Sequence, residues 1–167
     1  MKIWKMAVAM FSGMLLVSSV ALAQQPSSSG VIYKSITAAE VAKIMQQKGF
    51  RAEISTDKDG DPTIASADSG LKFDVYFYNC DKQAVKSCKV LQFVRGVDLA
   101  DGTSMQVIND WNSDRLYGTA WLDEENDPYL GITLTLVGGV TQEHLAETLL
   151  IFTTNMGRFD KTLYLKY

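Results

Sequence analysis

The stretch from Met105 to Val137 constrains the fold more than any other, because two alternating patterns stand on either side of one acidic turn. Apolar residues occupy every second position from Leu116 to Leu122 and again from Tyr129 to Val137, which is typical of strands with one buried face. The segment between them, Asp123–Pro128, is polar and rich in turn-forming residues. The stretch therefore predicts a β-hairpin.

Hydrophobic parity restricts the register of this hairpin, because a slip of one residue would move one apolar stripe to the solvent side. Pairing Leu122 with Leu130 keeps both stripes on one face of the sheet. On the reverse face this register sets Trp121 opposite Gly131, where the indole ring would cover bare glycine backbone. We therefore expect one apolar face that needs a covering layer and one face that carries rings.

Helix-start signals supply that covering layer. Thr37 with Glu40 and Thr103 with Gln106 have the spacing of a capping box, and Gly49 stands where a helix C-cap glycine belongs. The predicted helices are Ala38 to Lys48, a helix with Met105, Ile108 and Trp111 on one stripe, and a long helix after Thr141 with the stripe Leu145, Leu149, Phe152, Met156 and Phe159. The tail from Leu163 to Tyr167 alternates and is expected to add a short edge strand.

Four more strands are predicted between the first two helices: Phe50 to Ser55, Thr63 to Ser66, Leu71 to Asn79 and Cys88 to Arg95. A polar loop with a cysteine at each end joins the last two. Opposing Cys80 to Cys88 also opposes Phe77 to Leu91, so a disulfide agrees with the hydrophobic pattern. A bridge closing so short a loop would stabilise the fold by about 2–3 kcal/mol. The spacing is not the Cys-x-x-Cys of redox enzymes, which favours a structural role.

The first residues are typical of an export signal. Lys2 and Lys5 precede an apolar run, and the triplet Ala21-Leu22-Ala23 predicts cleavage after Ala23. No cysteine follows the cleavage site to accept a lipid, and the run is short for a membrane span. We therefore expect a periplasmic or secreted protein without membrane insertion after cleavage; an uncleaved anchor is the alternative.

The remaining chain has the size of one domain and an acidic balance. We assign residues 1–23 to the signal, 24–34 to a flexible polar lead-in and 35–167 to a single domain. Removal of the signal leaves 14 of the 16 basic residues against 19 acidic ones, a net charge of −5. Without a stripe of Lys and Arg, this charge argues against nucleic-acid and anionic-membrane partners. Small molecules, peptides and proteins remain as ligand classes.

The predicted order α-β-β-β-β-α-β-β-α indicates an α+β fold, an antiparallel sheet with the helices packed on one face. The opposite face would gather aromatic and hydroxyl side chains. Tyr76, Tyr78, Tyr117 and Trp121 are the candidate partner-binding residues there, and the cystine is expected on the same face. The alternative is that a terminal segment covers these rings, or that they simply pair across strands.

No residue cluster points to catalysis, a cofactor or a metal. The single histidine, His144, has no serine or cysteine motif around it that would pair a nucleophile with a base. Asp57, Asp59 and Asp61 are spaced like the opening of a calcium loop, but Pro62 stands where that loop needs glycine. A hairpin turn explains these residues equally, so calcium binding stays open at this point.

Four segments resemble the YbjN domain family, whose members are labelled bacterial sensory transduction regulators: Asp59–Ile64, Phe73–Tyr78 with the cysteine pair, Ile108–Arg115 and Leu122–Leu130. The resemblance covers about residues 35–159 and is most specific at Asn109, Trp111, Asn112 and Arg115. It implies a fold like that of type III secretion chaperones, which often dimerise and bind extended partner segments. It carries no catalytic set and no cofactor, and the export signal and cysteines depart from cytoplasmic members.

Asn109, Asn112 and Arg115 have two interpretations. They could cap the helix end and tie it to the acidic turn through an Arg115 ion pair, or they could line a ligand pocket. The favoured hypothesis for function is an exported, non-catalytic chaperone-like module that binds a protein or peptide through its aromatic sheet face and is able to form a homodimer. The alternative is a periplasmic sensor of a small ligand or of envelope stress, with a pocket between helices and sheet.

Overall fold

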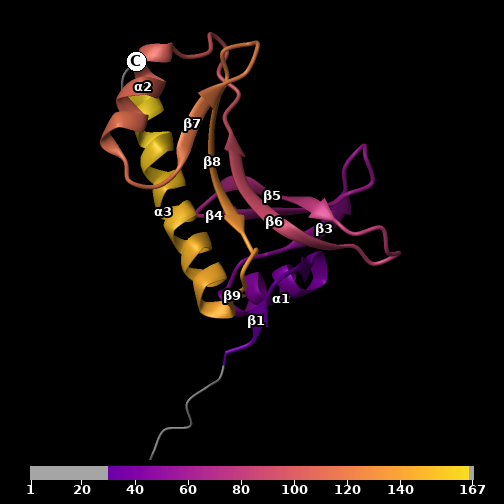
Figure 1. Ribbon diagram of the computed structural model, residues 1–167. Helices are drawn as coiled ribbons and strands as arrows, with labels where there is room; N and C mark the ends of the chain where they lie inside the picture. Colours follow the sequence, from indigo (N-terminus) through magenta and orange to yellow (C-terminus); the bar gives the residue numbers. More distant parts are fainter. Residues whose placement is uncertain (1–29, 166–167) are drawn as a thin grey trace, which may run out of the picture.

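The computed structural model describes residues 30–165 and shows a curved sheet with helices along it (Figure 1). The predicted signal sequence and most of the predicted lead-in lie outside the described residues. Within residues 30–165 the order is β1-β2-α1-β3-β4-β5-β6-α2-β7-β8-β9-α3. Apart from the two-residue strands β1, β2 and β9, this is the predicted order, so the α+β prediction is confirmed.

The helices are α1 (Ala38–Gln47), α2 (Met105–Asp114) and α3 (Gln142–Leu165). The strands are β1 (Ile32–Tyr33), β2 (Ile36–Thr37), β3 (Glu53–Thr56), β4 (Pro62–Asp68), β5 (Leu71–Cys80), β6 (Ser87–Gly96), β7 (Thr119–Leu122), β8 (Pro128–Thr135) and β9 (Val140–Thr141). The main sheet has the order β3-β4-β5-β6-β8-β7, with β2 paired to the start of β6. β1 and β9 form a separate ribbon, and all paired strands are antiparallel.

The central hairpin β5–β6 has the predicted register. Cys80 lies opposite Cys88 and Phe77 opposite Leu91. Phe77, Leu91 and the neighbouring Phe93 are almost completely buried. The cysteine pair and the alternation of apolar residues therefore both predicted the register that the structure has.

The predicted register of the second hairpin, β7–β8, is wrong by two residues: Leu122 pairs with Pro128 and not with Leu130. A slip of two residues leaves every side chain on its predicted face, so hydrophobic parity cannot detect it. The turn decides between the registers. The Asp127 amide donates to the Asp123 carboxylate at 2.9 Å, and the Asp123 amide donates to the Asp127 carbonyl at 3.1 Å, which closes a shorter turn.

Strand β7 is also shorter than predicted. Gly118 has a φ of +85°, in the left-handed region that favours glycine, and the extended backbone begins only at Thr119. Leu116, expected on the buried stripe, is 86% exposed. The linker between α2 and β7 thus turns outward before the sheet begins.

Helix α1 carries the predicted capping box. The Thr37 amide donates to the Glu40 carboxylate at 2.9 Å, and the Glu40 amide donates to the Thr37 hydroxyl at 3.3 Å. Gly49 follows the helix with a φ of +88°, as the C-cap pattern requires.

The cap of helix α2 is Ser104 and not Thr103. The Ser104 hydroxyl accepts the capping hydrogen bond at 3.4 Å, whereas the Thr103 amide donates to a carbonyl of the β7–β8 turn at 2.9 Å. Thr103 is thus bonded to the β7–β8 turn just before the helix starts. A local capping motif cannot predict this contact, because the turn is distant in the sequence. Of the predicted stripe, Ile108 and Trp111 are buried but Met105 is 58% exposed.

Helix α3 extends through the segment expected to form a short edge strand. The Thr141 hydroxyl accepts a hydrogen bond from the His144 amide at 3.1 Å and caps the helix as predicted. Leu163 lies one turn after Phe159, and both are buried in the core. Helical spacing therefore explains Leu163 better than strand alternation does, while residues 166–167 lie outside the described part.

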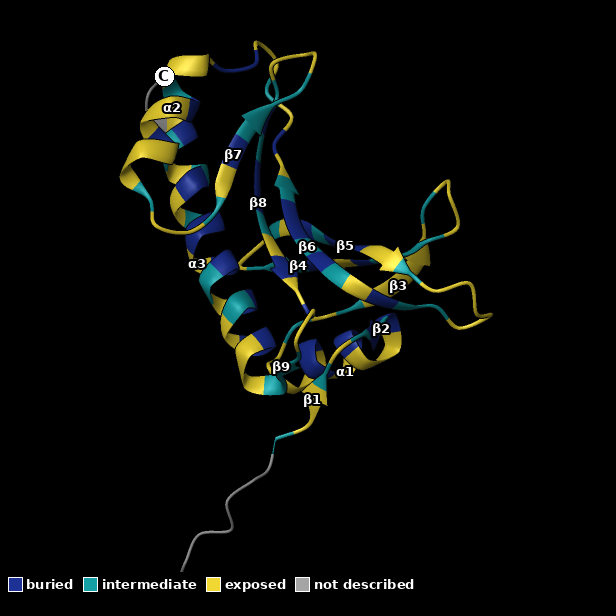
Figure 2. Cartoon of the chain, viewed as in Figure 1, coloured by how far each residue is buried: buried dark blue, intermediate teal, exposed yellow. Residues whose placement is uncertain are grey.

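One hydrophobic core joins the sheet to its helices, whose buried residues face inward in Figure 2. α1 lies against β3 and β4, and α3 against β6 and β8. The Phe152 ring of α3 packs edge-on to Phe73 of β5, with ring centroids 5.4 Å apart. The predicted helix layer on one face of the sheet is thus confirmed.

A largely buried ion pair ties the end of β6 to α3. The Arg95 guanidinium donates to the Asp160 carboxylate at 2.6 Å, and the two side chains are 12% and 16% exposed. Arg95 also donates to the Lys72 carbonyl at 3.0 Å. No sequence pattern predicted this ion pair, because Arg95 and Asp160 lie 65 residues apart in the chain.

Candidate partner-binding surface

The face of the sheet turned away from the core is called here the open face. Strand pairing sets side by side on it Tyr76 and Tyr78 of β5, Val90 and Gln92 of β6, Thr133 and Thr135 of β8, and Thr119 and Trp121 of β7. The Tyr78 hydroxyl donates to the Gln92 side-chain oxygen at 3.2 Å. The face thus combines rings with hydroxyl and amide groups.

The four predicted partner-binding residues differ in exposure. Tyr78 is 45% exposed and Tyr117, in the linker before β7, is 51% exposed. Tyr76 and Trp121 are half-buried. Tyr78 and Tyr117 therefore have free ring area for a partner, whereas the other two rings are partly used within the fold.

Trp121 has a structural task on this face. Its ring stacks on Tyr129, with centroids 5.6 Å apart and planes at 17°. A methyl group added at Gly131 would come within 2.9 Å of the same ring. The indole therefore covers the glycine backbone as predicted, although from a neighbouring rung of the ladder.

The centre of the open face is partly desolvated. Burial raises the pKa of Asp74 above its usual range. Burial also raises the pKa of Tyr76, and the Asp74 carboxylate adds to that shift. Val94, paired with Asp74 across the strands, is 7% exposed but lies outside the main core cluster. Some side chains are therefore packed against one another on the side without helices as well.

Within residues 30–165, strand β8 has no pairing partner on one side over its second half. β7 pairs only with residues 128–131, whereas β6 pairs with β8 as far as Thr135. The Leu136 amide donates to the Lys89 carbonyl of β6 at 2.8 Å. Because backbone groups of successive residues point to opposite edges, those of Thr133 and Thr135 point away from β6. They form a free strand edge, which is a template for an added strand.

Two clefts flank this edge and share Tyr117. A cleft of about 500 Å³ lies on the open face between Tyr117, Trp121 and Thr133. A second, of about 420 Å³, lies on the helix side between Tyr117, Ile132 and Ile151. Side chains of an added strand would alternate between these two hollows.

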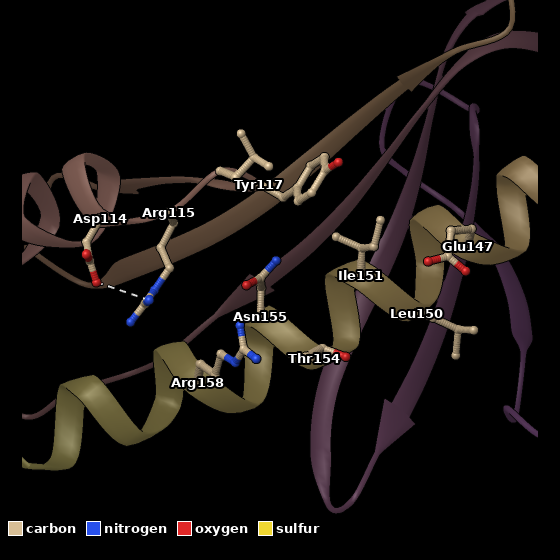
Figure 3. Close-up of a pocket in the computed structure, with 10 residues that line it drawn as sticks. Asp114, Arg115, Tyr117, Glu147, Leu150, Ile151, Thr154, Asn155 and Arg158 are labelled. Atoms are coloured by element: carbon tan, nitrogen blue, oxygen red, sulfur yellow. Dashed lines mark ion pairs between the residues drawn. The ribbon is translucent and has the colours of Figure 1, made fainter.

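A third cleft, of about 360 Å³, separates the α2–β7 linker from α3 and is shown in Figure 3. Arg115 and Tyr117 line it from the linker side, and Asn155 and Arg158 line it from α3. Sequence reasoning missed the α3 residues. The available signal was Asn155, a polar residue next to the apolar stripe that turns out to be 7% exposed.

Of the four motif residues, three lie in α2 and Arg115 follows it, and two stabilise the fold directly. Trp111 is buried and packs edge-on to Phe159, with centroids 5.0 Å apart. The Asn112 side chain pairs with the backbone of Ala120 in β7 through hydrogen bonds of 2.8 and 3.0 Å. Asn109 is exposed in the middle of the helix.

Arg115 ends the helix but is not tied to the acidic turn. It pairs with Asp114 of its own helix end at 3.1 Å, and its guanidinium carbon lies 4.9 Å from the centre of the Trp111 ring. The expected ion pair to the turn is therefore wrong. The Asp123 carboxylate of the acidic turn accepts hydrogen bonds from backbone amides of the turn and not from an arginine. Arg115 lines the third cleft instead.

A model of the YbjN family, described as "Putative bacterial sensory transduction regulator", matches residues 37–165. The chain belongs to the YbjN family. The match runs from the capping threonine of α1 to the end of α3, and so includes the whole main sheet except the first residue of β2.

Two further comparisons accompany the YbjN match. Among solved structures, the Yersinia pestis type III secretion chaperone SycH, in complex with a stable fragment of YscM2, is similar over 77% of this chain and 99% of its own, with 17% identity and a TM-score of 0.46. No curated protein matches the sequence. Within residues 30–165, no helix has both the length and the apolar character needed to cross a membrane.

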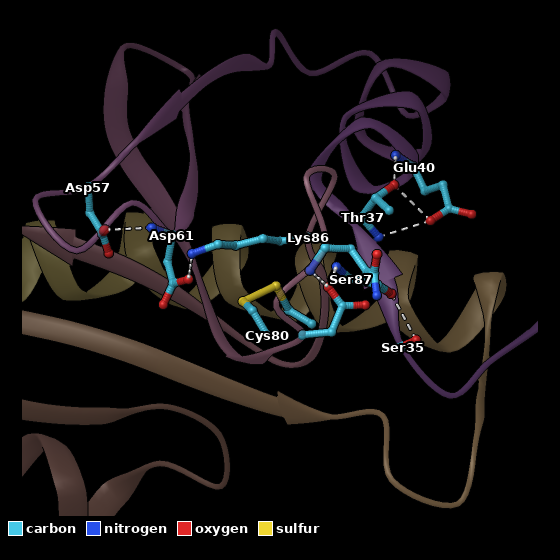
Figure 4. The surroundings of a disulfide bond; sticks show 11 residues. Ser35, Thr37, Glu40, Asp57, Asp61, Cys80, Lys86 and Ser87 are labelled. Atoms are coloured by element: carbon cyan, nitrogen blue, oxygen red, sulfur yellow. Dashed lines mark hydrogen bonds and ion pairs between the residues drawn. A yellow bond between two sulfur atoms is a disulfide. The ribbon is translucent and has the colours of Figure 1, made fainter.

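The cysteine pair of this YbjN-family chain forms the predicted disulfide (Figure 4). Cys88 is fully buried and Cys80 is half-buried against the core cluster. The expectation that the bridge lies among the exposed tyrosines is therefore wrong. The cause is the short strand β2, whose Ile36 pairs with Cys88 and covers it.

The two acidic turns have the same internal structure. In the first, the Asp57 carboxylate accepts a hydrogen bond from the Asp59 amide at 2.9 Å and one from the Asp61 amide at 2.8 Å, the second of which is drawn in Figure 4. In the second, Asp123 accepts from the Glu125 and Asp127 amides, both at 2.9 Å. The first carboxylate of each turn thus accepts hydrogen bonds from the backbone amides of the same turn. Among residues 30–165, no group of three or more acidic, His or Cys side chains is arranged to hold a metal ion.

Proposed function

We propose that this YbjN-family protein is an exported, non-catalytic binding module that holds an extended protein or peptide segment at the open face. One observation carries the proposal: two exposed tyrosines and a free strand edge lie together, with a cleft on each side of that edge. Membership of a family described as regulatory, without a catalytic set among the described residues, supports binding over catalysis.

Strand addition would match this surface chemically. Backbone groups of Thr133 and Thr135 offer sequence-independent hydrogen bonds, while the clefts select alternate side chains. Tyr78 and Tyr117 would add apolar area, and aromatic residues of this kind often dominate binding energy.

The test begins with a photo-reactive residue placed at position 117 in the full chain, followed by identification and purification of the crosslinked partner. Affinity for that purified partner is then measured in the Tyr78→Ala, Tyr117→Ala double variant. We expect at least about a tenfold loss, because two ring contacts disappear. Tyr164→Ala, an exposed tyrosine on α3, is the matched control. Unchanged affinity in the folded double variant would refute the proposal.

A proline tests strand addition itself. Thr133→Pro removes an amide that points away from β6, so the β6–β8 ladder should survive while partner binding falls. Ile132→Pro is the comparison, because its amide points to β6 and its loss should destabilise the sheet. Equal partner affinity in wild type and Thr133→Pro would exclude the strand edge as the docking site.

Export and self-association belong to the same proposal. N-terminal sequencing of protein recovered from the periplasm should begin at Gln24, and a chain that retains Met1 would contradict cleavage. Sedimentation at several concentrations tests whether the chain forms the expected homodimer.

A second candidate function, a sensor of a small ligand, is favoured by the third cleft. It lies between the α2–β7 linker and α3 and contains a buried polar side chain, Asn155. A ligand bound there would contact both the end of α2 with its linker and helix α3, because both line the cleft.

A further inference from the structure

We infer that the third cleft binds a carboxylate that carries an apolar tail. The inference deepens the second candidate function and does not depend on partner binding at the open face. It follows from three nitrogen-bearing side chains at one end of the cleft and apolar side chains beyond them.

The amide of Asn155 is the first observation. Asn155 is 7% exposed and lines the cleft, and its side chain forms no hydrogen bond with a described residue. Its amide atoms are not among the buried polar atoms that lack a partner, so they are open to the cleft. In Figure 3 the Asn155 side chain rises from α3 next to Arg158, on the side that faces the linker, so a ligand with a polar head could pair with it.

Arg115 is the second observation. Stacking on Trp111 and pairing with Asp114 hold its guanidinium in place at the cleft wall. Its Nε atom is nevertheless buried without a hydrogen bond among the described residues. Part of this pre-positioned donor group therefore remains unused.

Arg158 completes the head-group site. It rises from α3 on the opposite wall, is exposed, and takes part in no ion pair with a described residue. Two guanidinium groups and one amide can together donate to both oxygens of a planar carboxylate.

The two carboxylates in the lining argue against a ligand with two negative charges. Asp114 and Glu147 also line the cleft, so its side chains sum to neutrality with Arg115 and Arg158. A doubly charged phosphate would meet repulsion from both carboxylates, whereas a monocarboxylate meets less.

The remaining side chains of the cleft determine which apolar tail the ligand can have. Leu116, Leu150 and Ile151 line it beyond the arginines. Its volume of about 360 Å³ lies at the small end of ligand sites, which span roughly 300–1,000 Å³. A branched aliphatic acid or the C-terminal residue of a peptide has this chemistry.

Titration of the isotope-labelled protein with three probes tests the inference by NMR. The probes are N-acetyl-leucine, 4-methylpentanoate and N-acetyl-leucinamide, and the Asn155 side-chain amide signal is followed. Saturable shifts with either acid but not with the neutral amide would support the site. Binding of N-acetyl-leucine alone identifies a peptide terminus, and binding of both acids identifies a small-acid site. No saturable shift, or equal binding of the leucinamide, would overturn the inference.

Variants separate the head group from general effects. Arg158→Gln removes an exposed charge and should weaken N-acetyl-leucine binding about tenfold, as should Asn155→Asp through repulsion. Arg51→Gln, an exposed arginine just before β3, which is at the opposite edge of the sheet from β7, is the matched control. If Asn155→Asp fails to fold, Arg158→Gln still decides, and unchanged binding in it overturns the inference. Tyr78→Ala should leave this titration unchanged, so failure here is distinct from failure at the open face.

Discussion

Asn112 pairs with Ala120 as a neighbouring strand would. The Asn112 side-chain nitrogen donates to the Ala120 carbonyl at 3.0 Å, and its oxygen accepts from the Ala120 amide at 2.8 Å. Helix α2 thereby closes the outer edge of β7, the last strand of the sheet. On this side of the sheet, the edge that remains free among residues 30–165 lies one strand inward, at Thr133 and Thr135, where a further strand could be added.

Replacing Asn112 with Ala should destabilise the protein by about 2–3 kcal/mol, because two hydrogen bonds to a buried backbone are lost. Urea unfolding measures the change. Asn109→Ala is the control, since Asn109 is exposed on the same helix, and it should shift stability by less than about 0.5 kcal/mol. Similar losses in the two variants would show that the pairing contributes little.

Each acidic turn should depend on its leading aspartate. Asp57→Ala and Asp123→Ala are each expected to cost about 1–2 kcal/mol, while Asn at either position keeps the accepting oxygen and costs less. The two losses should add in the double variant, because the turns belong to hairpins at opposite edges of the sheet. Thermal melts with Asp59→Ala as the exposed control measure this, and a rise in melting temperature with calcium chloride would contradict a purely structural role.

Asp74 should make stability fall as pH rises through its titration. Burial raises its pKa above the ordinary 3.8, so the folded protein prefers the protonated form. Its contribution is fully present below pH 3.8 and is lost as pH rises through the raised value. Asp74→Asn should therefore be more stable than wild type at neutral pH and equal to it in strong acid. Denaturant titrations across this range provide the measurement, and a pH-independent difference would refute the assignment.

Reduction of the Cys80–Cys88 bridge should lower stability by about 2–3 kcal/mol without unfolding the β5–β6 hairpin. The bridge closes a short loop that is also held by the Lys86–Asp61 ion pair at 2.7 Å and by the Ser87–Ser35 hydrogen bond at 2.8 Å. Unfolding with and without dithiothreitol measures the cost. Cys80→Ala, which leaves the buried Cys88 in place, should reproduce the reduced value without a core cavity.

Local patterns sufficed for the elements whose signals are contained in a few residues. The Thr37–Glu40 capping box, the apolar stripe of α3 and the cysteine-flanked hairpin were all predictable, because each depends on neighbours in the chain or on strict strand parity. The open face with Tyr78 exposed followed from the same parity.

Tertiary structure decided the features that strand alternation and short motifs do not determine. A two-residue slip of β7 preserves every face, so only the backbone hydrogen bonds of Asp123 could choose the register. The burial of the disulfide depended on β2 reaching across to Cys88, and the Arg95–Asp160 pair joined residues far apart in the chain. The cleft of Arg115, Asn155 and Arg158 arises for the same reason: sequence determines which faces are apolar, but docking of the elements determines which polar groups meet.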